Sequence, residues 1–205
     1  PSSIQPIVEA SRRAYADRSE YLGDPDFVAI PVEGLLDSEY LKKRMISFDW
    51  SQATASSSVA SGKLTLQESP ETTHYSIIDS KGNAVAVTTT LNANYGSKLL
   101  VPSLGFFLNN EMDDFSSKPG VPNLYGVIGG EANAIAPEKR MLSSMTPTIV
   151  EQNGQLSMIL GSPGGSTIIT SVLQTILNVY DFKKNIQAAV QAPRFHHQWL
   201  PDSIK

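Results

Sequence analysis

Three short segments hold residue types that could bind a charged group. Gly161-Ser162-Pro163-Gly164-Gly165 comes directly before a wide apolar helical stripe, and glycines at the start of a helix let backbone N–H groups face a ligand where the helix dipole favours negative charge. The pair Asp113-Asp114 could hold a cation or an ammonium group, and Ser143-Ser144 could hydrogen-bond a carboxylate. Each segment also fits an ordinary role, namely a tight connection, a solvated acidic pair and a turn cap.

Composition narrows the candidate nucleophiles. The chain has no cysteine, which excludes a thiolate nucleophile, a disulfide and a thiolate metal site. Two of the three histidines, His196 and His197, are adjacent, and neighbouring side chains rarely converge on one metal ion, so we expect no metal site. Thr72 offers a hydroxyl at the head of a strand-like run. A threonine there is also common for purely structural reasons, because β-branched residues favour strands.

Charge and hydropathy exclude several partners. The 205 residues carry a formal net charge of −4, and the 16 lysines and arginines are scattered along the chain, so we expect no nucleic-acid partner. No apolar run approaches the roughly 18 residues of a membrane span, and the start Pro1-Ser2-Ser3 does not resemble a signal segment. The apolar content of 40% is enough for a packed core.

The sequence of the N-terminal third predicts helices followed by a linker. Apolar residues at three- and four-residue spacing predict a helix over residues 4–21 with one largely apolar face, ended by Gly23-Asp24-Pro25. A second helix is expected from about Ser38, taken as its N-cap. Residues 51–71 are rich in serine and have almost nothing to bury, which predicts a mobile linker.

The remainder alternates between hairpins, loops and helices. Residues 75–79 and 84–90 flank a turn-forming cluster, and Asn153-Gly154 separates the β-prone runs 148–150 and 156–160, so two hairpins are expected. Glycines and prolines over 119–130 predict a surface loop that could act as a lid. The stripe over 168–180 predicts a helix, as does the shorter run 186–190. The fold class is therefore α+β, with helices on the faces of sheets.

Five sequence blocks form one ordered pattern. They are 72–76 (TTHYS), 108–115 (LNNEMDDF), 142–150 (LSSMTPTIV), 161–165 (GSPGG) and 192–199 (APRFHHQW). In this order and spacing they resemble the γ-glutamyltransferase (glutathione hydrolase) family of N-terminal-nucleophile enzymes. Residues 14–27 are similar to a stretch near the end of that family's large subunit. The resemblance covers nearly the whole chain.

The resemblance implies a fold and a division of the chain. The implied fold is the four-layer αββα sandwich of the N-terminal-nucleophile hydrolases. Residues 1–71 resemble the end of the large subunit with its linker, and residues 72–205 resemble most of the small catalytic subunit. We therefore expect the chain to be part of a longer precursor, with the remainder of the large subunit as its partner. Family members work outside the cytosol, so a periplasmic or secreted location is expected.

The resemblance also implies how the chain becomes an enzyme. Family members cut themselves before a threonine, which here is the Glu71–Thr72 bond. A free α-amine has a pKa of about 7.7 to 8.0, so its neutral fraction can activate the hydroxyl of the same residue. No cofactor and no separate catalytic histidine are needed, and His74, His196 and His197 are expected to be structural.

Individual residues match the family's site. Thr72 matches the nucleophile, Thr90 the threonine that orients it, and Gly164 and Gly165 the oxyanion hole. The remaining matches concern the amino acid end of a γ-glutamyl substrate such as glutathione. Asn92, Glu111 and Asp114 match the groups that take the α-ammonium, Ser143 and Ser144 those that take the α-carboxylate, and Tyr125 a lid residue that bonds Asn92.

Two other functions remain open at this stage. The first is a related acylase that acts on another amide, such as a cephalosporin side chain; ammonium and carboxylate pockets argue against it. The second is an unprocessed, non-catalytic precursor that at most binds partners. The second alternative has support, because the chain contains residues on both sides of the cleavage bond and lacks the family's carboxylate-binding arginine.

Overall fold

The computed structural model describes residues 3–59 and 72–205 and divides the chain into two compact units. The first unit comprises Pro1–Gln67, Met112–Ser143 and His197–Lys205, and the second comprises Glu68–Glu111 and Ser144–His196. The division at residues 71 and 72, which concerns processing rather than packing, stays a prediction, and Glu71 lies outside the described residues.

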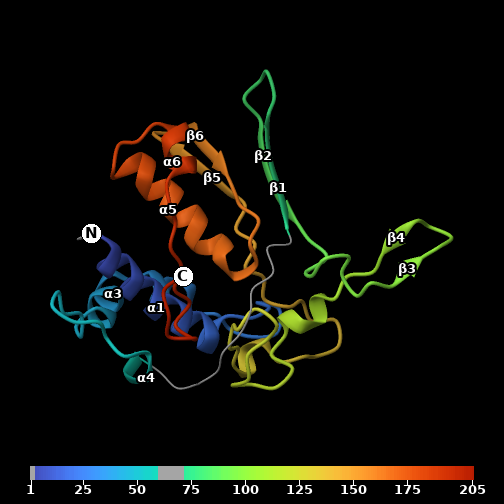
Figure 1. Cartoon of the computed structure of the whole chain (residues 1–205), viewed down its shortest axis with the longest axis horizontal. Helices are drawn as coiled ribbons and strands as arrows, with labels where there is room; N and C mark the ends of the chain where they lie inside the picture. The colour runs from blue at the N-terminus through green and yellow to red at the C-terminus, as the bar shows by residue number, and fades with distance from the viewer. Residues whose placement is uncertain (1–2, 60–71) are drawn as a thin grey trace. The chain divides into compact units, whose positions relative to one another are not determined.

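Helix α1 (Ile4–Tyr21) forms the centre of the first unit, and its bounds confirm the predicted helix (Figure 1). Its buried side is more polar than the predicted apolar face, since Glu9, Arg12 and Arg13 are all at least 95% buried. They are tolerated because they pair: Arg12 Nη1 lies 3.1 Å from Glu9 Oε1, and Arg13 bonds the other oxygen. Burial raises the pKa of Glu9, but bonds from Arg13 and Thr54 and the charge of Arg12 outweigh it, so the pKa falls below its usual value.

Two short helices follow α1. Helix α2 (Val32–Leu36) was not predicted. Helix α3 (Ser38–Arg44) confirms the second predicted helix, but its N-cap is Asp37 rather than Ser38. Asp37 Oδ1 accepts a hydrogen bond from Tyr40 N at 2.9 Å, which satisfies one of the unpaired N–H groups of the first turn.

The described part of the predicted linker is more ordered than its composition indicated. Helix α4 (Ser56–Val59) lies there, and Ser56 is fully buried. Ser56 N donates to Asp202 Oδ2 at 2.9 Å, and Trp199 Nε1 donates to Ser56 O at 3.2 Å. Where composition predicted a linker with almost nothing to bury, residues 56–59 therefore form a helix with one buried residue, and residues 60–71 lie outside the described part.

Loops and two 3₁₀ turns complete the first unit. The turns are η1 (Glu111–Asp114), at the boundary of the two units, and η2 (Glu131–Asn133). Between them, residues 119–130 form no helix or strand, as predicted. The loop is partly internal, because Tyr125 and Ile128 are each only 6% exposed. Asn123 Oδ1 accepts hydrogen bonds from Tyr125 N and Val127 N, both at 3.0 Å, which fixes the turn around Tyr125.

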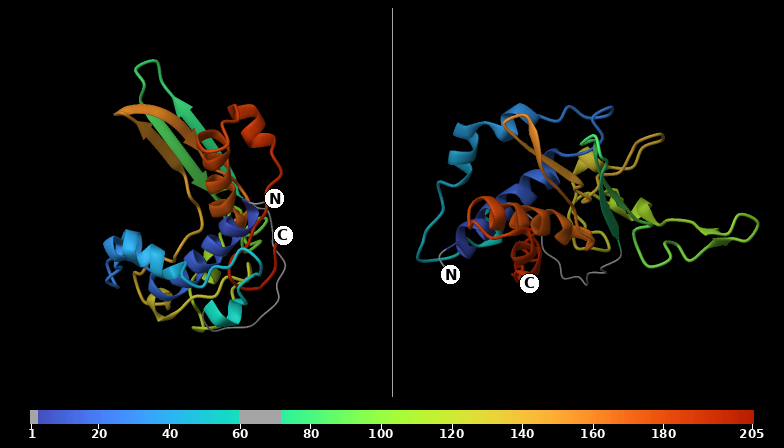
Figure 2. Two further views of the ribbon diagram at one scale, coloured as in Figure 1. Left: turned by 90° about the vertical axis from the view of Figure 1, so that its left-hand side faces the viewer. Right: turned by 90° about the horizontal axis from the view of Figure 1, so that it is seen from above.

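The second unit holds both predicted hairpins. Strands β1 (Thr73–Ile78) and β2 (Ala84–Thr89) pair in register, with Thr73 opposite Thr89. Strands β5 (Thr148–Gln152) and β6 (Gln155–Leu160) pair through a turn in which Asn153 and Gly154 both have positive φ, as the Asn-Gly signal predicts. The two hairpins lie side by side (Figure 2). A third, short hairpin of β3 (Leu100–Val101) and β4 (Phe106–Phe107) was not predicted.

Two helices follow the β5–β6 hairpin along the chain. A 3₁₀ turn, η3 (Gly165–Thr167), leads into α5 (Ile168–Tyr180), and α6 (Ile186–Gln191) begins after its cap Asn185. Helix α5 packs on β6, and the core of this unit consists of Met158, Leu160, Ile168 and Val172. Because β6 leads directly through the glycine turn into α5, this packing positions the glycines at one end of the core.

The fold is mixed α and β, with antiparallel hairpins. Each sheet formed by the described residues has two strands, so the four-layer αββα arrangement stays a prediction. None of the helices within residues 3–59 and 72–205 is long and apolar enough to cross a membrane.

Candidate active site

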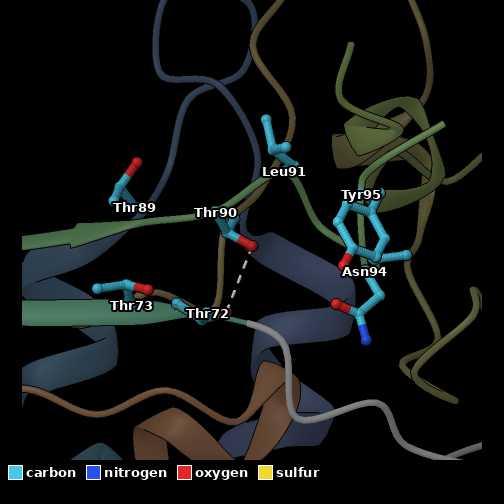
Figure 3. Close-up of a pocket in the computed structure, with 8 residues that line it drawn as sticks. Thr72, Thr73, Thr89, Thr90, Leu91, Asn94 and Tyr95 are labelled. Carbon is cyan, nitrogen blue, oxygen red and sulfur yellow. Dashed lines mark hydrogen bonds between the residues drawn. The ribbon is translucent and has the colours of Figure 1, made fainter. Parts of the chain in front are cut away.

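Thr72 and Thr90 face each other at the open end of the first hairpin. Each lies one residue outside the last paired residues, Thr73 and Thr89. The register therefore brings the two hydroxyls together, and Thr72 Oγ1 donates a hydrogen bond to Thr90 Oγ1 at 3.4 Å (Figure 3). Thr72 was expected at the start of a strand, and it directly precedes β1, which begins at Thr73. The role of Thr90 in orienting Thr72 stays a prediction.

A pocket of about 340 Å³ opens beside this pair. Its lining consists of Thr72, Thr73, Thr89, Thr90, Leu91, Ala93, Asn94 and Tyr95 (Figure 3). Among the described residues, the lining carries five hydroxyl groups, one from Tyr95 and four from threonines at the open end of the hairpin, and no charged side chain. A ligand that entered this pocket would therefore meet the Thr72 hydroxyl in a polar but uncharged environment.

Thr90 is itself held by the backbone that follows it. Its Oγ1 accepts a hydrogen bond from Asn92 N at 2.9 Å, so both acceptor positions of this oxygen are used when Thr72 also donates. Asn92 has a φ of +75°, which turns the chain sharply after β2. Its side-chain Nδ2 donates to Asn110 O at 3.3 Å. The Thr72 hydroxyl is thus the first member of a chain of bonds that ends at Asn110.

Asn110 and Glu111 follow the short hairpin. Asn110 Oδ1 accepts from Ala93 N at 2.9 Å, and Asn110 N donates to Leu91 O at 3.1 Å, so this segment is tied to the turn after β2. Asn110 was missed by sequence reasoning, although it lies within one of the five blocks. Glu111 comes next and is partly buried, and burial raises the pKa of its carboxyl. A cation bound there would lower that pKa again.

The glycine turn adopts conformations that only glycine tolerates readily. Gly164 has a φ of +130° and Gly165 a φ of +55°. Thr167 closes the turn, because its N and its Oγ1 both donate to Gly164 O, at 3.0 Å and 2.7 Å. The prediction of a glycine-rich turn at a helix N-terminus is confirmed, with η3 between the glycines and α5.

Three of the predicted site residues belong to the first unit, namely Asp114, Tyr125 and Ser143. Asp114 ends η1, and its backbone oxygen accepts from Asn133 Nδ2 at 2.7 Å. Its charge also acts on Arg18: burial lowers the pKa of Arg18, and Tyr15 and Asp114 oppose that shift. The interaction of Asp114 with Arg18 was not predicted, because 96 positions separate the two residues. Tyr125 is buried, and its backbone oxygen accepts from Gln198 Nε2 at 3.0 Å.

The two serines fall on either side of the boundary between the units. Ser143 is exposed and ends the first unit, and Ser144 begins the second. The structure thus brings together Thr72, Thr90 and Asn92 within the second unit. Assembly of Asp114, Tyr125 and Ser143 around Thr72 stays a prediction, as do the roles of all these residues.

Comparison with known proteins places these residues in a family context. The family model described as Gamma-glutamyltranspeptidase matches residues 1–205. The glutathione hydrolase proenzyme of Escherichia coli K12 is 54% identical over 203 residues, which are 99% of this chain and 35% of that protein. The glutathione hydrolase proenzyme of Pseudomonas aeruginosa is 50% identical, over 97% of this chain and 35% of its own length. The chain thus spans about a third of the length of these curated relatives.

Solved structures agree with this comparison. A crystal structure of acivicin-inhibited gamma-glutamyltranspeptidase is 63% identical, with a TM-score of 0.63, over 64% of this chain and 70% of that one. The cephalosporin acylase from Bacillus halodurans is 26% identical, with a TM-score of 0.73, over 93% of this chain and 32% of the acylase. The family model covers every residue, and the two relatives named above are 54% and 50% identical over nearly the whole chain. The chain therefore belongs to the gamma-glutamyltranspeptidase family.

Proposed function

We propose that this protein transfers γ-glutamyl groups from glutathione and related γ-glutamyl amides to water or to amino acid and peptide acceptors. The observation that carries the proposal is the hydrogen bond from Thr72 to Thr90 at the edge of an open pocket. It holds the Thr72 oxygen at the open end of the hairpin, beside space for a substrate. Membership of the family supplies the substrate class.

The first step of the proposal is self-cleavage at the Glu71–Thr72 bond. Thr72 Oγ1 attacks the carbonyl carbon of Glu71, the C–N bond breaks, and the hydroxyl proton passes to the released amine of Thr72. Water then hydrolyses the ester, which gives the Glu71 carboxylate and regenerates the hydroxyl. Thr72 becomes an N-terminal residue that supplies both the nucleophile and, through its neutral amine, the base.

The second step is acyl transfer. Thr72 Oγ1 attacks the γ-carbonyl carbon of the substrate, its proton passes through the α-amine to the leaving amine, and a γ-glutamyl ester remains on the enzyme. The backbone N–H groups of Gly164 and Gly165 stabilise the oxyanion, and removal of one such donor in other enzymes costs on the order of 3 kcal/mol. Water or an acceptor amine then releases the γ-glutamyl group.

Substrate recognition in this proposal uses the two ends of the glutamate. Asn92, Glu111 and Asp114 take the α-ammonium, and Ser143 and Ser144 take the α-carboxylate, through charge-assisted hydrogen bonds. The raised pKa of Glu111 supports this role, because a half-buried acid gains most from a cation that compensates its lost hydration. Tyr125, in the loop 119–130, bonds Asn92 and closes the site.

A second candidate function is that of a cephalosporin-type acylase, favoured by the structural similarity to the Bacillus halodurans enzyme. One experiment on the full-length protein separates the two candidate functions. γ-Glutamyl-p-nitroanilide and glutaryl-p-nitroanilide differ only in the α-ammonium group. We expect release of p-nitroaniline from the first at least about a hundredfold faster, since a site built around charged partners rejects a substrate that lacks one. Equal rates, or a preference for the glutaryl compound, would support the acylase.

A further inference from the structure

The imidazole ring of His74 is fixed by two hydroxyl groups of the first hairpin. His74 Nδ1 lies 2.8 Å from Thr88 Oγ1, its cross-strand partner, and Nε2 lies 3.0 Å from Ser76 Oγ. A neutral imidazole has one donor and one acceptor, and a hydroxyl can serve as either, so both bonds form in either tautomer. The plane of the ring is therefore determined by β1 and β2.

This ring lies directly against the backbone of Gly161. A Cβ atom added to Gly161 would come within 2.1 Å of His74 Nδ1, 2.2 Å of Cε1 and 2.6 Å of Cγ. Such distances mean that the ring occupies the space a side chain would need. Gly161 does not have a positive φ, so alanine there meets no left-handed backbone strain, and the three atoms nearest to its Cβ would all belong to the His74 ring.

Gly161 begins the segment that contains the proposed oxyanion donors. Gly164 and Gly165 follow three and four residues later, and Thr167 holds the far end through its two bonds to Gly164 O. Side chains at positions 72 and 74 lie on the same side of an extended chain, because orientation alternates along a strand. The contact between His74 and Gly161 is thus close along the chain to both parts of the proposed site. His74 is two residues from Thr72, and Gly161 is three and four residues from Gly164 and Gly165.

We propose that His74 is a positioning residue, whose ring spaces the Gly161–Gly165 turn from Thr72 by packing against the Cα of Gly161. The inference rests on the proposed function, since it concerns the distance between that function's nucleophile and its oxyanion donors. An error of about 1 Å in such a distance can reduce a rate about a hundredfold. Removal of the ring takes away the contact at the Gly161 end of the turn, and a methyl group on Gly161 pushes the turn away from the ring.

The test compares Gly161→Ala, His74→Ala and the double variant, each prepared in the protein as its gene encodes it. Rates of p-nitroaniline release from γ-glutamyl-p-nitroanilide are expressed per molecule cut at Thr72, as counted by intact mass, and thermal unfolding is recorded for each variant. Gly34→Ala is the control for the added methyl, because the nearest atom to its Cβ would be 3.9 Å away and its φ is not positive. Tyr75→Ala, at an exposed neighbouring position, is the control for His74→Ala.

Both single variants are expected to lower kcat at least about tenfold, a part of the loss seen when an oxyanion donor is removed, with KM within about threefold. The double variant is expected to have the same kcat as His74→Ala. It should also regain the Tm lost in Gly161→Ala, because the new methyl group then occupies the space that the ring has left. Additive losses in kcat, or a Gly161→Ala protein with unchanged kcat and Tm, would overturn the inference. Absence of γ-glutamyl hydrolysis in the unaltered protein would instead overturn the proposed function, and the Tm comparison would still test the contact.

Discussion

Thr90 Oγ1 accepts hydrogen bonds from both Thr72 Oγ1, at 3.4 Å, and Asn92 N, at 2.9 Å. The second bond fixes the position of the Thr90 oxygen. The first is long for two hydroxyl groups, so it keeps the Thr72 oxygen in place while the proton of Thr72 can still pass to the α-amine. Because an oxygen that accepts twice can still donate its own proton elsewhere, Thr90 orients the nucleophile without acting as its base. The proposed base is the amine of Thr72 itself.

Thr90→Val is expected to remove this orientation while the side chain keeps its shape. The substitution removes both hydrogen bonds that Thr90 Oγ1 accepts, from Thr72 and from Asn92. Loss of the bond to Thr72 alone, at about 1 kcal/mol, corresponds to a fall in kcat of about fivefold, and release of the Asn92 backbone should increase the loss. Steady-state hydrolysis of γ-glutamyl-p-nitroanilide measures the effect. Thr89→Val is the matched control, since Thr89 is exposed and also lines the pocket; equal losses in the two variants would contradict the role of Thr90.

Asp114→Asn is expected to raise KM for γ-glutamyl substrates strongly. The substitution replaces a charge-assisted hydrogen bond to the α-ammonium with a neutral one, and such bonds are about half as strong. The neighbouring Asp113→Asn is the control, because Asp113 Oδ2 accepts from Leu124 N and an amide oxygen can still do so. A KM that is unchanged in Asp114→Asn would count against this assignment.

Tyr125→Phe is expected to shift the fate of the acyl-enzyme towards hydrolysis. The ring stays buried in the loop 119–130, while the hydroxyl that bonds Asn92 in the proposal is lost, so water should reach the intermediate more easily. Free glutamate and γ-glutamyl-dipeptide are quantified at one acceptor concentration in both proteins. Equal product ratios would mean that the loop is only a connector.

The pair of Asp24 and Arg140 is expected to make stability depend on acid pH. Arg140 donates to Asp24 through its side chain, at 3.0 Å and 2.6 Å, and through its backbone N, at 2.8 Å, and these bonds hold the pKa of Asp24 far below its usual range. A lowered pKa stabilises the folded state above the unfolded value of about 3.9, and this contribution is lost as pH falls through the folded value.

The measurement for this pair is Tm between about pH 6 and pH 2. Asp24→Asn should lower Tm at the upper end, and its difference from the unaltered protein should shrink as the pH falls below about 4. Glu33→Gln, at an exposed position in the first turn of α2, is the control. A difference in Tm that stays constant over this range would show that the bonds do not depend on the charge of Asp24.

Local signals explain which elements could be predicted from the sequence. The apolar stripes of α1 and α5 and the turn clusters of the two longer hairpins act within one element, so their bounds were predicted closely. Helix α2 has only five residues and too little periodicity to be recognised. The burial of Ser56 depends on Trp199 and Asp202, more than 140 positions away, and no local pattern carries that information.

The same distinction applies to the site. The pairing of Thr72 with Thr90 follows from the hairpin register, which the turn after residue 78 determines. Contacts between distant elements do not follow in this way. Neither the ring of His74 on Gly161 nor the action of Asp114 on Arg18 could be predicted, since each depends on how separate elements pack.

The central claim is that Thr72 performs both the self-cleavage and the catalysis. Its most direct test is the intact mass of the protein as its gene encodes it, unaltered and with Thr72→Ala, together with p-nitroaniline release from each. The account predicts two fragments divided at the Glu71–Thr72 bond and measurable release for the unaltered protein, and one uncut, inactive chain for Thr72→Ala. A single intact mass for the unaltered protein would indicate a dormant precursor, and normal cleavage or activity in Thr72→Ala would contradict the claim.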